Sequence, residues 1–92
     1  MIQSFACRET GALFNRERSR RFHQIERVAR RKLAMLHAAH ALDDLRSPPG
    51  NRLEALRGDR AGQHSIRIND QYRICFVWTQ AGPENVEIVD YH

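Results

Sequence analysis

The spacing of apolar residues predicts one long helix in the first half of the chain. At 100° per residue, a helix over residues 20–41 carries apolar side chains on one side and arginines on the opposite side. Ser19 precedes it as a candidate N-cap, and the run Ser47-Pro48-Pro49-Gly50 prevents helical structure from continuing. The expected buried side consists of Phe22, Ile25, Ala29, Leu33, Leu36 and His40.

Two shorter elements are expected before this helix. Residues 2–5 alternate between apolar and polar positions, as in a short edge strand. Thr10 is a candidate N-cap for a short helix running toward Arg16, because a threonine hydroxyl can accept a hydrogen bond from the first helical amides.

The second half of the chain follows the period of two that is typical of strands. Strands are predicted over residues 52–56, 64–68, 72–78 and 86–91. Turns are predicted at residues 58–62, at Asn69-Asp70 and over residues 80–83. The pattern therefore indicates one α+β domain over residues 1–92, with the N-terminal helices packed on one face of a mainly antiparallel sheet.

Charge changes this picture by suggesting an anionic partner. The chain has 92 residues, a net charge of +4, and fourteen arginines against one lysine. Residues 16–32 contain eight basic residues and two acids, a local net charge of +6. A solvated helix face would also carry arginines, but this density favours contact with phosphate. The residues expected to bind RNA are Arg16, Arg20, Arg27, Arg30 and Arg31.

Other classes of function find no support in the sequence. Cys7 and Cys75 are too few for a disulfide framework, and the histidines do not have the spacing of zinc ligands. No phosphate-binding loop, dinucleotide fingerprint or nucleophile elbow is present. Since no signal peptide, lipidation motif or long apolar run occurs, a cytoplasmic protein without a membrane partner, metal or cofactor is expected.

The final residues, Asp90-Tyr91-His92, bring an acid, a phenol and an imidazole together after a strand. RNA cleavage without a metal needs a base for the 2′-OH, stabilisation of the phosphorane-like charge and a proton for the leaving oxygen. His92 suits proton transfer because an imidazole titrates near neutral pH. Arg57 and Arg73 suit charge stabilisation because a guanidinium offers several donors to phosphate oxygens.

The sequence resembles HigB-type toxins of the RelE/ParE superfamily, which belong to bacterial type II toxin–antitoxin systems. The resemblance covers essentially the whole chain, in order, and no single piece of it is specific by itself. It rests on Ile2-Gln3-Ser4-Phe5, Pro49-Gly50-Asn51-Arg52-Leu53, Leu56-Arg57-Gly58-Asp59, Ser65-Ile66, Tyr72-Arg73-Ile74-Cys75-Phe76 and Val89-Asp90-Tyr91-His92.

The resemblance implies a compact RelE-like fold and a ribosome-dependent mRNA endonuclease that works without a metal, with the messenger in a groove between helices and sheet. It implies that Arg73 stabilises phosphate charge and that Arg57 stands where a lysine is common. Residues 90–92 match the terminal catalytic segment. It also implies a HigA-like helix-turn-helix antitoxin from the same operon, and contact with operator DNA only through that complex.

One position departs from the family pattern. Glu54 stands where well-studied members carry histidine, and it could act as a base, repel the messenger or pair with Arg57. Two other functions therefore stay open on the same fold: a ParE-like inhibitor of DNA gyrase that cuts no RNA, and a catalytically weakened toxin that acts mainly through antitoxin and operator binding.

Overall fold

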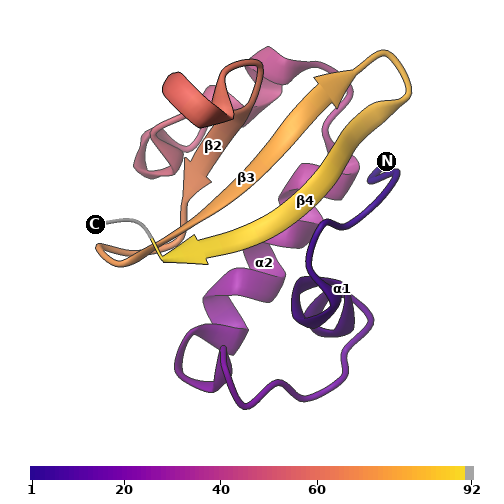
Figure 1. Cartoon of the computed structure of the whole chain (residues 1–92), viewed down its shortest axis with the longest axis vertical. Coiled ribbons are helices and arrows are strands. Elements are labelled where there is room, and N and C mark those ends of the chain that lie inside the picture. The colour runs from indigo at the N-terminus through magenta and orange to yellow at the C-terminus, as the bar shows by residue number, and fades with distance from the viewer. Residues whose placement is uncertain (91–92) are drawn as a thin grey trace.

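The computed structural model describes residues 1–90 and has the α+β architecture that the sequence predicts (Figure 1). Helices α1 (Arg8–Phe14) and α2 (Glu26–Ala38) pack on one face of a four-stranded antiparallel sheet. Its strands are β1 (Glu54–Ala55), β2 (His64–Arg67), β3 (Tyr72–Thr79) and β4 (Gly82–Asp90), in the order β1-β2-β3-β4. Four short 3-10 helices lie in the connections: η1 (His23–Ile25), η2 (Leu42–Arg46), η3 (Pro49–Asn51) and η4 (Gly58–Arg60).

The core lies between the two helices and the sheet. Leu13 of α1 and Leu33 and Leu36 of α2 are fully buried against Ile74 and Phe76 of β3. Burying each such side chain stabilises the fold by roughly 1.5–3 kcal/mol. The predicted buried side of the helix is confirmed except at His40, which is exposed beyond the end of α2. Within residues 1–90, no helix is long and apolar enough to cross a membrane.

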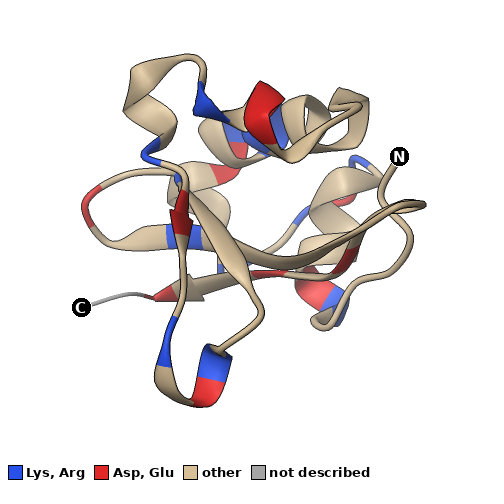
Figure 2. Cartoon of the chain, turned by 90° about the horizontal axis from the view of Figure 1, so that it is seen from above, with Lys and Arg blue, Asp and Glu red and all other residues tan. Residues whose placement is uncertain are grey.

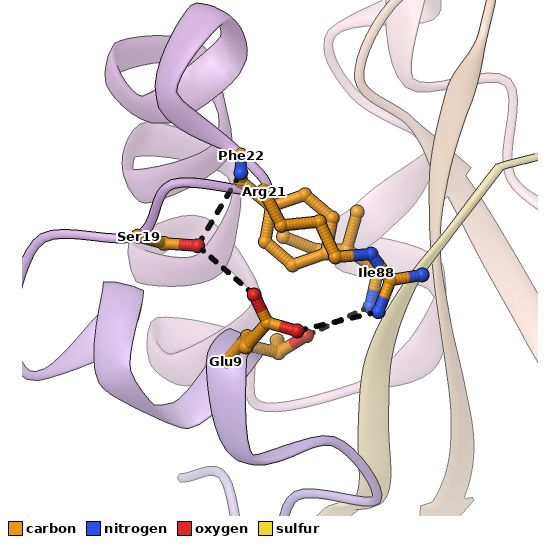
Figure 3. Close-up of polar contacts among 6 residues, drawn as sticks. Glu9, Ser19, Arg21, Phe22 and Ile88 are labelled. Carbon is orange, nitrogen blue, oxygen red and sulfur yellow. Dashed lines mark hydrogen bonds and ion pairs between the residues drawn. The ribbon is translucent and has the colours of Figure 1, made fainter.

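The long helix predicted over residues 20–41 is wrong at both ends. Phe22 is fully buried and meets the ring of Tyr72 edge-on at 5.9 Å, so the segment turns toward the sheet before α2 begins at Glu26. Ser19 is accordingly not the N-cap of α2. Figure 3 shows its hydroxyl between the Phe22 amide, which donates to it at 3.3 Å, and the carboxylate of Glu9 at 3.5 Å.

Thr10 is also not a helix cap, because α1 already begins at Arg8. The Thr10 side chain is fully buried and its hydroxyl accepts a hydrogen bond from the amide of Ile88 in β4 at 3.0 Å. This bond satisfies a strand amide that helix α1 shields from water.

Residues 2–5 lie beside β4 but do not form the predicted edge strand. They make one isolated parallel bridge, Phe5 with Val86, in which the Val86 amide donates to the Ser4 carbonyl at 3.0 Å. A bulge in the β3–β4 ladder and the left-handed backbone of Asn85 (φ 52°) interrupt β4 at this point, so the pairing does not extend.

The predicted turns are confirmed, whereas the strand over residues 52–56 is reduced to the two residues of β1. The Asn69 side chain accepts hydrogen bonds from the amides of Gln71 and Tyr72 at 2.9 and 2.8 Å and closes the β2–β3 hairpin. Arg52 adopts a left-handed backbone (φ 45°) after η3, which excludes it from the strand.

Candidate functional site

One row of residues crosses the sheet on the face turned away from α1 and α2. The register pairs Glu54 with Ser65, Ser65 with Cys75, and Cys75 with Glu87. Directly opposite residues share a face, and alternation places Arg73 on this face as well. We call these five residues the polar face. The expected groove between helices and sheet is wrong as its location, because the core fills that interface.

Arg73 is buried, although an arginine in a strand is usually exposed. Its Nε donates to the Ser65 hydroxyl at 2.7 Å, and its Nη2 donates to the backbone carbonyls of Arg52 at 2.6 Å and Ser65 at 3.3 Å. These bonds fix the plane of the guanidinium before any ligand arrives, and such preorganisation is what stabilisation of a transition-state charge requires.

Glu54 is the acid that lies next to this guanidinium. One carboxylate oxygen is 3.8 Å from the Arg73 Nε, and about half of the Glu54 side chain is exposed. The alternative pairing of Glu54 with Arg57 is wrong, since Arg57 makes no ion pair among residues 1–90. Arg57 is exposed on the loop just before η4.

Cys75 lies under a second cation of the polar face. Arg60 of η4 reaches across the sheet to Glu87 at 2.9 Å. Burial is the main reason that the pKa of the Cys75 thiol is raised, and it opposes the pull of Arg60 and Arg73 in the other direction. The thiol is therefore neutral near pH 7, as expected for a structural residue rather than a nucleophile.

Asp90 lies one register step from Arg73 but on the other face of the sheet. Asp90 pairs with Tyr72, whereas Arg73 pairs with Val89. The exposed Asp90 carboxylate accepts a hydrogen bond from the Gln71 side chain at 3.0 Å. Tyr91 and His92 lie outside the residues that the structure describes.

The arginines of residues 16–32 are not equivalent. Arg16, Arg20, Arg27 and Arg31 are exposed. Arg30 instead binds Glu26 at 2.6 Å and donates to the carbonyls of Leu13 and Glu17 at 3.1 and 2.9 Å, which ties α2 to the end of α1. In Figure 2, positive residues occur on several elements with acidic residues among them.

Two shallow clefts connect this basic region with the end of β4. The first, of about 470 Å³, is lined by Arg16, His23, Gln24, Glu26, Arg27 and Arg30. The second, also of about 470 Å³, shares Gln24 and continues over Arg20 and Arg21 to Gln71, the partner of Asp90. An extended anion on the helices would therefore run toward the terminal segment.

Sequence reasoning missed the residues that hold Arg73. Ser65 and Asn51 are fully buried polar residues, and Lys32 is a buried lysine. Ser65 was visible only as a polar position in an alternating strand, and Asn51 only as part of Pro49-Gly50-Asn51-Arg52-Leu53. Neither position indicates burial without the fold.

The sheet, its helical cover and the arginine on the polar face define a RelE-like toxin domain. A family model described as "RelE-like toxin of type II toxin-antitoxin system HigB" matches residues 11–92. The chain therefore belongs to the HigB-like toxin family.

Among known proteins, the chain is similar to Toxin HigB-1 of Vibrio cholerae serotype O1 (strain ATCC 39315 / El Tor Inaba N16961). The two are 56% identical over 54 residues, which is 59% of this chain and 57% of that protein. An uncharacterized protein of Haemophilus influenzae (strain ATCC 51907 / DSM 11121 / KW20 / Rd) is 46% identical over 50 residues, 54% of this chain and 50% of its own. The matches thus span about half the length of these curated relatives.

Proposed function

We propose that this protein is the toxin of a type II toxin–antitoxin system and that it inhibits translation as a ribosome-dependent, metal-independent mRNA endonuclease. The observation that supports this proposal best is the buried Arg73, held by three hydrogen bonds and placed 3.8 Å from the half-exposed Glu54. A fixed guanidinium beside an accessible carboxylate offers charge stabilisation and proton transfer at one phosphate.

In this mechanism the 2′-oxygen attacks the adjacent phosphorus while a base removes its proton, and the 5′-oxygen leaves after protonation. Arg73 stabilises the negative charge on the phosphoryl oxygens, and Arg57, exposed nearby in the chain, contributes a second guanidinium. Glu54 removes the 2′ proton. His92 or Tyr91 delivers the proton to the leaving oxygen, and Asp90 orients or balances His92.

Two partners follow from the same proposal. The ribosome presents the messenger, and its RNA phosphates contact the exposed arginines Arg16, Arg20, Arg27 and Arg31. A HigA-like helix-turn-helix antitoxin neutralises the toxin and carries it to operator DNA.

Primer extension on a cellular mRNA after a short pulse of expression tests the activity. The full chain is expected to give new 5′ ends within coding regions, and a chain ending at Val89 is expected to give none while still binding the antitoxin. Growth arrest without cuts, accompanied by signs of DNA damage, would instead support inhibition of DNA gyrase. Equal cutting by the shortened chain would remove Asp90, Tyr91 and His92 from the mechanism.

Reversing the charge of Arg27 and Arg31 together is expected to weaken ribosome binding. Each lost phosphate contact should reduce the slope of log affinity against log salt by about 0.7–0.9. The measurement is binding of an Arg73→Met protein, used to prevent cleavage, to ribosomes at several salt concentrations.

Arg30→Gln is the matched control. It removes one positive charge from the same helix, but the guanidinium it deletes is engaged with Glu26 and two carbonyls. We expect lower thermal stability and an unchanged salt slope. An equal loss of slope in this variant would contradict the assignment of ribosome contact to the exposed arginines.

A further inference from the structure

A continuous set of buried polar groups runs from helix α2 to Arg73. The Lys32 ammonium donates to the side-chain oxygen of Asn51, and the Asn51 amide donates to the carbonyls of Leu45 at 3.1 Å and Ser47 at 3.4 Å. The next residue, Arg52, presents its carbonyl to the Arg73 Nη2 at 2.6 Å. We call Lys32, Asn51, the Arg52 carbonyl and Arg73 the buried polar chain.

Stability gives no reason for a lysine at this position. Lys32 is only 8% exposed, and its one hydrogen-bond partner is a neutral amide. Among residues 1–90 it forms no ion pair with a carboxylate. Removing an amine from water without a carboxylate is unfavourable, and an apolar side chain of similar volume would fill the space at lower cost.

Lys32 does decide how Asn51 is oriented. A lysine can only donate, so the oxygen of the Asn51 amide must face it and the nitrogen must face the Leu45 and Ser47 carbonyls. Asn51 is fully buried, and its own amide donates to the Pro48 carbonyl at 2.9 Å. The loop from Leu45 to Asn51 is therefore fixed to α2 at one point.

The backbone after Asn51 depends on that point. Arg52 has a left-handed backbone (φ 45°), a conformation that non-glycine residues adopt only where the surroundings impose it. This conformation directs its carbonyl to Arg73. Glu54, which opens β1, comes two residues later and lies 3.8 Å from the same guanidinium.

We propose that Lys32 and Asn51 are positioning residues for the cleavage reaction, which set the guanidinium of Arg73 and the carboxylate of Glu54 through the Arg52 carbonyl. This inference rests on the proposed endonuclease function. Neither side chain touches the messenger. Their effect is on the chemical step, because small misplacements of a charge-stabilising group cost far more in rate than in binding.

Lys32→Met is the first test. We expect the single-turnover rate of mRNA cleavage on saturating ribosomes to fall by about 10–100-fold, while the half-saturating ribosome concentration changes by less than about threefold. Thermal unfolding should occur within about 5 °C of the wild type, because the unfavourable burial of the amine is removed together with its hydrogen bond. An unchanged rate in this folded variant would overturn the proposal.

Asn51→Leu is the second variant, and Thr79→Val is its control. Thr79 bonds the Gly82 carbonyl at 2.7 Å at the far end of β3, so its replacement removes side-chain hydrogen bonds without reaching Arg73. Only Asn51→Leu should slow cleavage. In an Arg73→Met background, Asn51→Leu should have no further effect on the residual rate, whereas an equal fall there would show that Asn51 acts independently of Arg73.

A measurement without cleavage separates this proposal from the function on which it rests. The Nε–H of Arg73, assigned by its loss in Arg73→Met, donates to the Ser65 hydroxyl and should exchange slowly with solvent in NMR spectra. Lys32→Met and Asn51→Leu should accelerate this exchange at least about tenfold. Wild-type protein that cuts no RNA would refute the proposed function alone, whereas unchanged exchange in both variants would refute the positioning role.

Discussion

Replacing Arg73 by methionine is expected to reduce the single-turnover rate of mRNA cleavage by about 10²–10³-fold, the usual cost of losing one preorganised donor to a transition-state oxyanion. Methionine fills a similar volume but removes every donor. The hydrogen bonds to Ser65 and Arg52 show that the guanidinium is fixed in advance, so its loss should fall on the chemical step rather than on ribosome binding. Rates at saturating ribosome concentration measure this effect.

The same substitution should lower the free energy of unfolding by about 1–3 kcal/mol, because it leaves buried acceptors without their donor. Arg67→Met is the matched control. Arg67 pairs with Arg73 across the β2–β3 ladder, but its side-chain ion pair is with the fully exposed Asp70. Its cleavage rate should stay within about threefold of wild type, since an exposed ion pair contributes little. A similar loss in both variants would indicate a general effect of charge on RNA binding.

Replacing Glu54 by glutamine is expected to reduce cleavage by about 10²–10⁴-fold, the range typical of general acid–base catalysis. Glutamine keeps the shape of the side chain and the contact with Arg73, but it cannot accept the 2′ proton. The pH dependence of the single-turnover rate should also change, because the limb that reports the base disappears. The measurement is that rate across the pH range in which the protein stays folded.

Two further variants make this result decisive. Glu54→His supplies the residue that related toxins carry there, and it should restore much of the activity that glutamine removes. Glu84→Gln removes a negative charge opposite Val77, toward the far end of the sheet, and should leave cleavage unchanged. Faster cleavage by Glu54→Gln would mean that the acid repels the messenger, and the protein would then be a weakened toxin.

Local patterns predicted the sheet well because strands and tight turns follow from nearest neighbours along the chain. The alternation at Ile66 and Ile74 and the Asn69 turn all recur in the structure. The pattern failed at the start of α2. Phe22 has the spacing of a helical residue, but its burial against Tyr72, distant in the sequence, turns the backbone away from a continuous helix.

Candidate chemistry divides in the same way. The sequence by itself determined the α+β class, the arginine-rich segment and the presence of Arg73, Glu54 and the terminal Asp90, because composition, period and motif are properties of the chain alone. Only the tertiary structure decided that Arg73 is buried and bonded, that Glu54 rather than Arg57 lies beside it, and that Asp90 projects from the opposite face. These facts depend on strand register and on contacts across many residues, and no local pattern encodes either one.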